Sequence, residues 1–331
     1  MDRFKIIKML GEGGISQAFL ALDEKNGKLV TYKRAKPSID EDENVFDQEA
    51  SILKSFCSHE FKELIQANRI PRVIGYGRAH IIVSFISGEN LLDLLRKRGK
   101  LKEKETLNIA KDLLEIFKTL HESENPIVYR DLKPANIVIN KNGRASLIDF
   151  GAARHYKKDE RGDDTVSLGT VGYAAPEQYG SLGKSNEQTD IYSFGITLIA
   201  LLTGVTTKDA NGLSMVRCGA LKNVSPQLLF VIENCIKADR EKRFKTFKEV
   251  EKEIKKIPSK IFLCRIGKAV KIVAAALFIS ITIAVGIKYE DSVRRMIKGD
   301  FTERYPVIQY RLLIARQRIT DIVETFIMQE S

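Results

Sequence analysis

The hydrophobic pattern of this 331-residue chain changes between about residue 83 and Leu91, and this change limits the fold more than any other feature. Before it, short β-branched runs such as Lys28–Tyr32 and Ile81–Val83 alternate with turns, which predicts a small, largely antiparallel sheet. One helix is expected in the same region, over roughly residues 43–56, because apolar residues recur there at helical spacing.

From Leu91 onward the pattern is helical. Four stretches carry apolar residues at helical spacing and are mostly amphipathic or buried. They are residues 107–120, 190–202, 227–237 and 245–257. The sequence therefore predicts an α+β protein with a small sheet lobe, about residues 1–83, and a larger helical lobe, about residues 88–257.

The chain carries 54 basic and 43 acidic residues, a net charge of +11. This excess is compatible with nucleic acid, an anionic membrane surface or a phosphate-rich ligand, and charge alone does not choose among them. With 44% hydrophobic and 29% charged residues, the composition is globular and argues against disordered and fibrous classes. The four cysteines lack CxxC spacing, so we expect free thiols in a reducing cytosol and no structural zinc site.

An uncharged run of 16 residues, Ile272–Ile287, lies near the C-terminus and is flanked by lysines. At 1.5 Å per residue the run spans about 24 Å, and snorkelling lysines extend its reach across a hydrocarbon core of about 30 Å. A buried core helix is the alternative, but the two-lobed pattern is complete before residue 258. We therefore predict a single transmembrane helix over residues 269–289.

The segments on either side of this predicted helix suggest its orientation. Residues 252–271 hold seven Lys and Arg residues and residues 288–307 hold five, which favours a cytoplasmic N-terminal portion. Residues 258–268 then form a basic juxtamembrane linker, and residues 290–331 a short extracytoplasmic tail. Apolar residues of the tail recur at spacings of four and three after Pro306. This spacing predicts a helix, either a surface amphipathic helix or a coiled coil that forms a homodimer.

The segment Leu10–Ser16, LGEGGIS, joins two predicted strands. Glycines allow backbone amide groups to approach a phosphate closely. Taken alone, the segment fits an ordinary glycine-rich hairpin equally well.

Five short motifs follow one another along the chain. They are Gly11-x-Gly13-x-x-Ser16-x-Ala18, Val30-Thr31-Tyr32-Lys33, Tyr129-Arg130-Asp131-Leu132-Lys133-Pro134-Ala135-Asn136, Asp149-Phe150-Gly151 and Ala175-Pro176-Glu177. The chain thus resembles the eukaryotic-like Ser/Thr protein kinases of bacterial type over about residues 4–257. The resemblance implies a two-lobed kinase domain over residues 1–257.

The resemblance implies transfer of the ATP γ-phosphate, a reaction that mainly needs alignment and stabilisation of spread negative charge. Lys33 is then expected to meet the α and β phosphates. Glu49 is the acid expected to hold Lys33, because it lies beside the apolar face of the helix over residues 43–56. Glu43 and Asp47 are nearby alternatives.

By the same resemblance, Asp131 orients and deprotonates the acceptor hydroxyl. Lys133 reaches the transferred phosphoryl group, as in Ser/Thr-specific kinases. Asn136 and Asp149 bind the Mg²⁺ ions that bridge the phosphates. ATP and Mg²⁺ are the implied cofactors, proteins with Ser or Thr acceptors are the implied substrates, and no nucleic-acid partner is expected.

The resemblance also places an adenine pocket between the lobes, with Val83 at its back. The expected nucleotide-binding residues are Leu10, Gly11, Gly13, Ser16, Ala18, Lys33, Val83, Ser84 and Ile86. Two positions depart from the family pattern, because Ser16 replaces the third glycine and Tyr129 replaces a histidine. Neither departure removes a catalytic group.

The polar segment between Gly151 and Glu177 resembles an activation segment. Thr165 and Ser167 are candidate phosphorylation sites that Arg130 would pair with; a simple solvent-exposed loop is the alternative. The resemblance further implies that Thr170 positions the catalytic loop. Three more residues are expected to be structural: Glu177 and Arg243 as an ion pair, and Asp190 as a buried acid at the start of a helix.

The sequence thus favours a single-pass, membrane-anchored signalling kinase with a cytoplasmic catalytic domain that phosphorylates its own activation segment. A pseudokinase scaffold that binds nucleotide without efficient catalysis is the main alternative. It would predict loss of Lys33, Asp131 or Asp149, and all three are present. A small-molecule kinase of related fold is a further alternative, against which stands the peptide-groove segment GTVGYAAPE.

Overall fold

The computed structural model describes residues 3–37, 45–156, 170–179, 184–206, 219–257 and Gln317. The predicted linker, the predicted transmembrane helix and the rest of the predicted tail lie outside the described residues, as do Thr165 and Ser167. Among the helices that are described, none combines the length and apolar character needed to cross a membrane. All described residues except Gln317 fall within one compact unit, Met1–Ile261.

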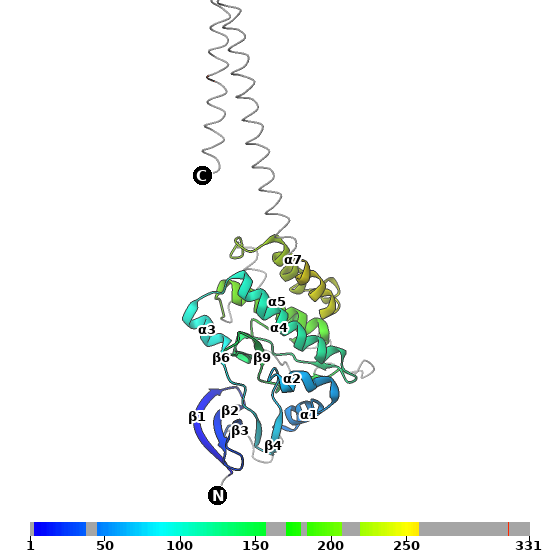
Figure 1. Cartoon of the computed structure of the whole chain (residues 1–331). Coiled ribbons are helices and arrows are strands. Elements are labelled where there is room, and N and C mark those ends of the chain that lie inside the picture. Colours follow the sequence, from blue (N-terminus) through cyan, green and yellow to red (C-terminus); the bar gives the residue numbers. More distant parts are fainter. Residues whose placement is uncertain are drawn as a thin grey trace, which may run out of the picture. The chain divides into compact units, whose positions relative to one another are not determined.

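The small lobe is built on one five-stranded antiparallel sheet (Figure 1). Its strands are β1 (Phe4–Glu12), β2 (Ser16–Asp23), β3 (Lys28–Ala35), β4 (Val73–Gly77) and β5 (His80–Ser84). The strand order is β1-β2-β3-β5-β4, so β1 and β4 form its edges. Gly27 provides the positive φ, 69°, in the turn that joins β2 to β3, a conformation that costs glycine little.

Two α-helices lie in the connection between β3 and β4, where the sequence predicted one. Helix α1 (Asp47–Ser55) starts four residues later than expected; Val45 and Phe46 form a turn, and Phe46 is buried. The second helix, α2 (Lys62–Gln66), has only five residues, too few for apolar periodicity to reveal it.

The large lobe is mainly helical, as expected. Its elements are β6 (Glu89–Asn90), α3 (Leu91–Arg98), α4 (Glu103–Glu122), β7 (Ile127–Val128), β8 (Ile137–Ile139), β9 (Ala145–Leu147), β10 (Arg154–His155), α5 (Glu187–Thr203) and α7 (Pro226–Cys235), with further helix over residues 247–257. Helix α5 is buried along nearly its whole length and packs against α4 and α7 (Figure 1). A helix that is apolar all round belongs in a core.

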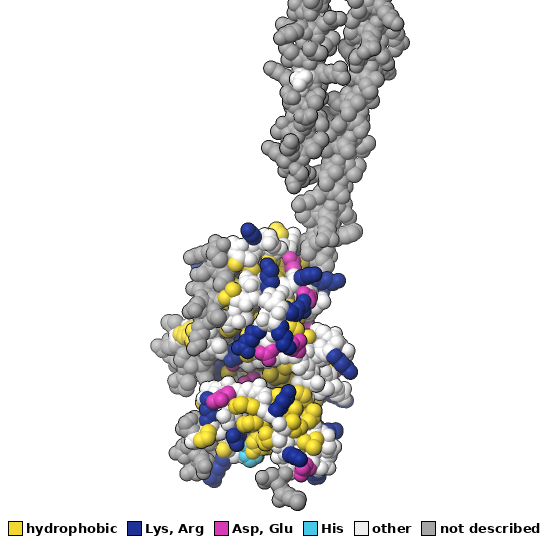
Figure 2. Space-filling view, turned by 90° about the vertical axis from the view of Figure 1, so that its left-hand side faces the viewer, with side chains coloured by type: hydrophobic (Ala, Val, Ile, Leu, Met, Phe, Trp, Pro, Cys, Tyr) yellow, Lys and Arg dark blue, Asp and Glu magenta, His cyan; other side chains and the backbone are white. Residues whose placement is uncertain are grey.

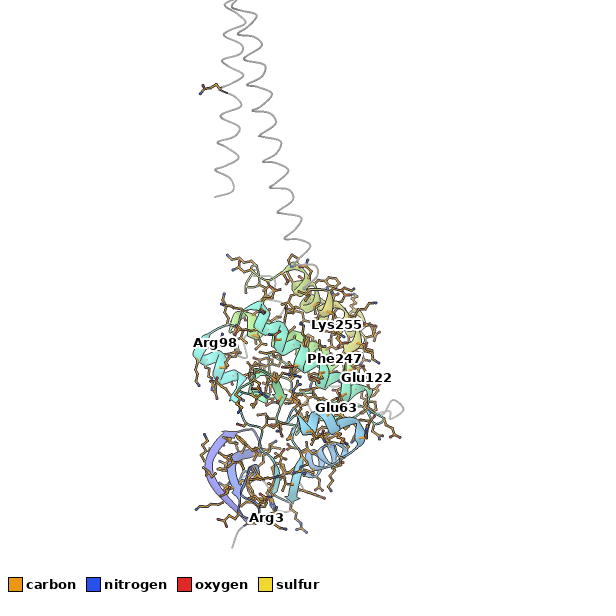
Figure 3. The ribbon with its side chains drawn as sticks, in the orientation of Figure 1. Arg3, Glu63, Arg98, Glu122, Phe247 and Lys255 are labelled. Carbon is orange, nitrogen blue, oxygen red and sulfur yellow. The ribbon has the colours of Figure 1, made fainter. Side chains whose placement is uncertain are left out.

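A chain of aromatic contacts connects the two lobes. Phe56, at the end of α1, lies 4.9 Å from Phe150 between ring centroids, and Phe150 lies 5.1 Å from Tyr129. Tyr129 contacts Phe117, which stacks at 4.7 Å on Phe247, labelled in Figure 3 within the large lobe. The segment around Phe150 is thus packed between the helix of the small lobe and the core of the large lobe.

The outer strand β1 exposes several apolar side chains, including Ile6, Ile7 and Met9. Figure 2 shows hydrophobic side chains gathered on the small lobe. The β1–β2 register shifts twice, and the exposed Lys5 and Lys8 interrupt the apolar residues of β1. Bulges and edge lysines both discourage pairing with another strand.

Candidate active site

Lys33 on β3 lies between two carboxylates from different lobes. Its Nζ donates to Glu49 Oε1 at 2.5 Å and to Asp149 Oδ1 at 2.9 Å. Lys33 and Glu49 are buried, whereas the Asp149 side chain is 44% exposed. Of the acids considered for this pairing, Glu49 contacts Lys33 because the helical phase of α1 turns it inward, whereas Asp47 is exposed and Glu43 lies outside the described residues.

The charged groups of this cluster shift one another's pKa values. Burial alone would lower the pKa of Lys33, but the carboxylates of Asp149 and Glu49 outweigh it and hold that pKa above its usual value. Burial raises the pKa of Glu49. For Asp149, partial burial opposes ionisation, yet the Lys33 ammonium and the Gly151 amide keep its pKa below the usual range. Lys33 therefore stays cationic and Asp149 anionic at neutral pH.

Asp131 is the centre of a second polar cluster. Its Oδ1 accepts a hydrogen bond from the Thr170 hydroxyl at 2.7 Å. Its Oδ2 accepts from Lys133 Nζ at 2.8 Å and from Asn136 Nδ2 at 2.9 Å. Lys133 Nζ also lies 2.5 Å from Thr170 Oγ1. The carboxylate is thus held in one orientation with a cation beside it, an arrangement that can receive a proton from a hydroxyl group.

The backbone before Asp131 is fixed by a buried acid. Arg130 has a φ of 72°, which is unfavourable for a residue with a side chain. Asp190, fully buried in α5, accepts the amides of Tyr129 and Arg130 at 2.8 and 2.7 Å. The ring N–H of His121 at Nε2 donates to the same carboxylate at 2.8 Å. Asp190 is therefore the buried acid expected at this helix start, and it stabilises the strained catalytic loop.

Tyr129, which stands where the family has histidine, is fully buried between Phe117 and Phe150. Among the described residues, no group is hydrogen-bonded to its hydroxyl oxygen. Burial raises the pKa of Tyr129 well above its usual value, and the nearby Asp149 carboxylate adds to this. The side chain is thus a neutral phenol that contributes packing, and no described residue forms a hydrogen bond with its hydroxyl.

Replacing Tyr129 by Phe is expected to raise the melting temperature. The change removes a buried hydroxyl that has no hydrogen-bond partner among the described residues and keeps the ring contacts. We therefore expect the free energy of unfolding to rise by about 1 kcal/mol and the melting temperature by roughly 2–4 °C. Thermal unfolding followed by circular dichroism checks this. A lower melting temperature would show that the hydroxyl has a stabilising partner, and Tyr129→Ala, which also removes the ring, serves as the destabilised control.

The expected nucleotide-binding residues of the sheet lie on one face. Ala18 pairs with Lys33, and Val83 pairs with Thr31, two residues before Lys33. Because side chains alternate along a strand, Ala18, Lys33 and Val83 share a face. The other expected nucleotide-binding residues of the sheet lie at or near the β1–β2 connection. Leu10 and Gly11 belong to β1, Gly13 lies in the connection, and Ser16 begins β2.

The segment that joins the lobes begins at Ser84. Its amide donates to Arg72 O at 2.8 Å, and its hydroxyl accepts from the Arg72 amide at 2.9 Å. Ile86 is buried. Gly88 passes so close to β8 that an added Cβ would lie 2.4 Å from Ile139 O. A side chain at that position would displace the connection.

Glu177 and Arg243 form the ion pair expected from the sequence. Arg243 Nη1 and Nη2 donate to Glu177 Oε1 and Oε2 at 2.7 and 2.9 Å, and both residues are buried. Three backbone carbonyls accept the remaining donors of Arg243, those of Lys237, Ala238 and Gln188. Burial opposes ionisation of Glu177, but Arg243 keeps the pKa of that carboxyl below its usual value.

The sequence analysis did not identify several residues that support the site. Gln178 donates to Arg130 O at 2.9 Å, and Asn90 donates to Ala135 O at 2.7 Å. Both hold carbonyl groups of the loop that contains Asp131. A third residue, Arg69, has a buried guanidinium group, and no motif marked it.

The site offers oxygen donors for a divalent metal. Asn136 and Asp149 lie on neighbouring segments of the chain, because the Ile148 amide donates to Asn136 O at 3.1 Å. Among the described residues, no group of three or more His, Cys, Asp and Glu side chains is placed to hold a metal by itself. One carboxylate, one amide and the phosphates of a nucleotide are nevertheless the donor set that suits Mg²⁺.

A comparison of the sequence with known protein families agrees with the two lobes and the two polar clusters described above. The family model of the protein kinase domain matches residues 4–256. The chain belongs to the protein kinase family. Membership of this family implies the use of ATP and a divalent metal.

Individual relatives of this kinase come from bacteria and plants. Serine/threonine-protein kinase PknA of Nostoc sp. is 30% identical over 272 residues, or 75% of this chain and 46% of the relative. Serine/threonine-protein kinase D of Synechocystis sp. is 32% identical over 226 residues, or 61% and 41%. Calmodulin-binding receptor-like cytoplasmic kinase 2 of Arabidopsis thaliana is 34% identical over 207 residues, or 59% and 48%. The bacterial matches support the bacterial Ser/Thr type, and the chain spans less than half the length of these relatives.

Proposed function

We propose that this chain is a Ser/Thr protein kinase that transfers the γ-phosphate of ATP to hydroxyl groups of proteins. The observation that carries the proposal is that both halves of the chemistry are assembled together. Lys33, Glu49 and Asp149 form one cluster, and Asp131 with its partners forms the other. A scaffold without catalysis would need neither cluster to be complete.

Each side chain has a role that follows from its contacts. Lys33, held cationic between two carboxylates, binds the α and β phosphates of ATP. Asp131 orients the acceptor hydroxyl and takes its proton, and Lys133, which contacts Asp131, offsets charge on the transferred group. A bound Mg²⁺ would neutralise charge on the phosphates, and Asn136 and Asp149 are the residues that would hold it.

The proposal is tested with the full-length chain in detergent, incubated with Mg²⁺, labelled ATP and a generic protein substrate. We expect phosphate on Ser and Thr residues of the substrate, and none with Asp149→Asn. Nucleotide binding without phosphate transfer by the wild-type chain would instead identify a pseudokinase scaffold. Phosphate transfer to a small molecule but not to protein would identify a small-molecule kinase of related fold.

We also propose that the kinase domain is cytoplasmic and anchored to the cell membrane by residues 269–289, with residues 290–331 outside. The support is the uncharged run Ile272–Ile287 and the excess of basic residues before it. A reporter enzyme fused after Ser331 should read as extracytoplasmic. A cytoplasmic reading for both the reporter and the kinase domain would exclude a single span.

Autophosphorylation of the activation segment is the last part of the proposal. Thr165 and Ser167 lie in the polar segment that precedes Thr170, and the catalytic loop contains a basic residue, Arg130, next to Asp131. A phosphate on this segment would pair with that arginine. Phosphosite mapping of the wild-type chain should find phosphate at Thr165 or Ser167, and Asp149→Asn should lack it.

A further inference from the structure

Arg69 is a buried arginine in the connection between helix α2 and strand β4. Its side chain is 2% exposed, whereas arginine side chains are rarely buried unless their charge is paired. The C-terminus of helix α2 fixes the backbone at this position. Asn68 adopts a left-handed conformation with a φ of 52°, its amide donates to Ile65 O, and the Arg69 amide donates to Leu64 O at 2.8 Å. These two bonds form a Schellman motif, which fixes the direction in which the chain leaves the helix.

The guanidinium group of Arg69 reaches into the large lobe. Its Nη1 donates to Glu115 Oε2 at 2.8 Å and its Nη2 donates to Asp112 O at 2.8 Å, both on α4. The Asp112 carboxylate lies 3.7 Å from Nη2. Arg144 pairs with the same two acids from the other side, at 2.7 Å each. Among the described residues, the acids that neutralise the buried charge of Arg69 therefore both belong to the large lobe.

Arg69 also completes the free edge of strand β9. Its Nε donates to Ala145 O at 2.5 Å, and its backbone oxygen accepts from the Leu147 amide at 2.9 Å. In the three-stranded sheet β6-β8-β9, strand β9 is an edge. Arg69 thus supplies one donor and one acceptor to that edge, as a neighbouring strand would.

These contacts connect Arg69 to the segments of chain that carry the two acids facing Lys33. On one side, Phe56, which directly follows α1, contacts Phe61, which directly precedes α2, at 4.7 Å between ring centroids, and α1 carries Glu49. On the other side, β9 ends at Leu147, two residues before Asp149, and the Ile148 amide bonds the carbonyl of Asn136. Arg69 thus lies in the connection that follows α1 and α2, and it is hydrogen-bonded to the strand that leads to Asp149.

We propose that Arg69 is a positioning residue that couples helix α1 to the strand preceding Asp149 and so sets the site for the nucleotide-bound metal. The inference rests on the proposed kinase function. Without the Arg69 side chain, β9 loses the hydrogen bond to Ala145 O and the α2–β4 connection loses its bonds to α4, so Asp149 can move relative to Asn136 and Lys33. Metal-dependent nucleotide binding then requires more Mg²⁺, whereas binding of the protein substrate is unaffected.

The test measures binding of a fluorescent ATP analogue to the full-length chain as Mg²⁺ is varied, well below the melting temperature of each variant. We expect Arg69→Met to raise the half-saturating Mg²⁺ concentration about tenfold, the size of effect typical of residues that orient metal ligands. Arg69→Lys keeps the charge but cannot make the three separate contacts, so we expect an increase of about threefold. The KM for the protein substrate should stay within about twofold of wild type in both variants.

Arg144→Gln is the matched control, because Arg144 contacts Asp112 and Glu115 but is half exposed and is not hydrogen-bonded to the α2–β4 connection. Its Mg²⁺ dependence should stay within about twofold of wild type. Wild-type Mg²⁺ dependence in Arg69→Lys would overturn the coupling even if Arg69→Met fails to fold. An equal shift in Arg144→Gln would overturn it as well. A wild-type chain that binds the Mg²⁺–nucleotide complex but transfers no phosphate would defeat only the kinase proposal.

Discussion

Replacing Asp131 by Asn is expected to lower kcat by about two to four orders of magnitude, the range attributed to a positioned general base. The amide is close in shape to the carboxylate. Its oxygen can still accept from Lys133 and Asn136, and its NH₂ can donate to Thr170 if that hydroxyl reverses its role. The loop should therefore keep its structure and lose only the group that takes the proton.

The KM for ATP separates this effect from loss of fold. No hydrogen bond between described residues joins the Asp131 side chain directly to Lys33, Glu49 or Asp149, so this KM should stay within about threefold of wild type. Thr170→Val removes only the hydroxyl that orients Asp131 and should cost about tenfold in kcat. Steady-state kinetics of the wild type, Asp131→Asn and Thr170→Val measure kcat and the KM for ATP and so test both expectations. Wild-type kcat in Asp131→Asn would exclude Asp131 as the base.

The residues that carry the proposed chemistry could be predicted because local spacing determines them. Asp131, Lys133 and Asn136 fall in one eight-residue loop, so their proximity follows from the loop itself. Glu49 was a harder case, because its partner lies 16 residues away. It could still be chosen over Glu43 and Asp47, since a helix buries one face and Glu49 lies beside the apolar residues of that face.

Other parts of the site could not be predicted from the sequence. Arg69 contacts residues 43, 46 and 76 positions away in the chain. Before the fold is known, a single arginine in a polar stretch reads as a surface residue, because arginine is usually exposed. Gln178 and Asn90 act through carbonyl groups, which every residue carries, so no sequence pattern marks these contacts. The later start of α1 reflects Phe46, an apolar residue that packs in a turn before the helix.

Replacing Arg243 by Met is expected to destabilise the large lobe by about 3–5 kcal/mol, because it leaves the buried carboxylate of Glu177 without its counter-charge. For a domain of this size that corresponds to a fall in melting temperature of roughly 6–20 °C. Three backbone carbonyls lose their donor in the same change. The double variant Arg243→Met/Glu177→Leu removes the stranded charge as well, so it should recover part of the loss.

The pH dependence of this loss identifies its cause. Arg243 holds the pKa of Glu177 below its usual value of 4.5, so in the wild type the ion pair contributes stability at neutral pH and loses it as pH falls through that lowered pKa. In Arg243→Met, burial acts on Glu177 without the opposing charge of Arg243, and the remaining hydrogen bond from Thr189 offsets it only in part, so the pKa of Glu177 rises. Protonation of Glu177 at low pH then removes the unpaired buried charge of the variant. The difference in unfolding free energy between variant and wild type should therefore be largest near pH 7 and shrink towards pH 4. Urea unfolding across that range measures the difference. A constant difference would assign the destabilisation to lost packing and lost carbonyl hydrogen bonds, because neither titrates.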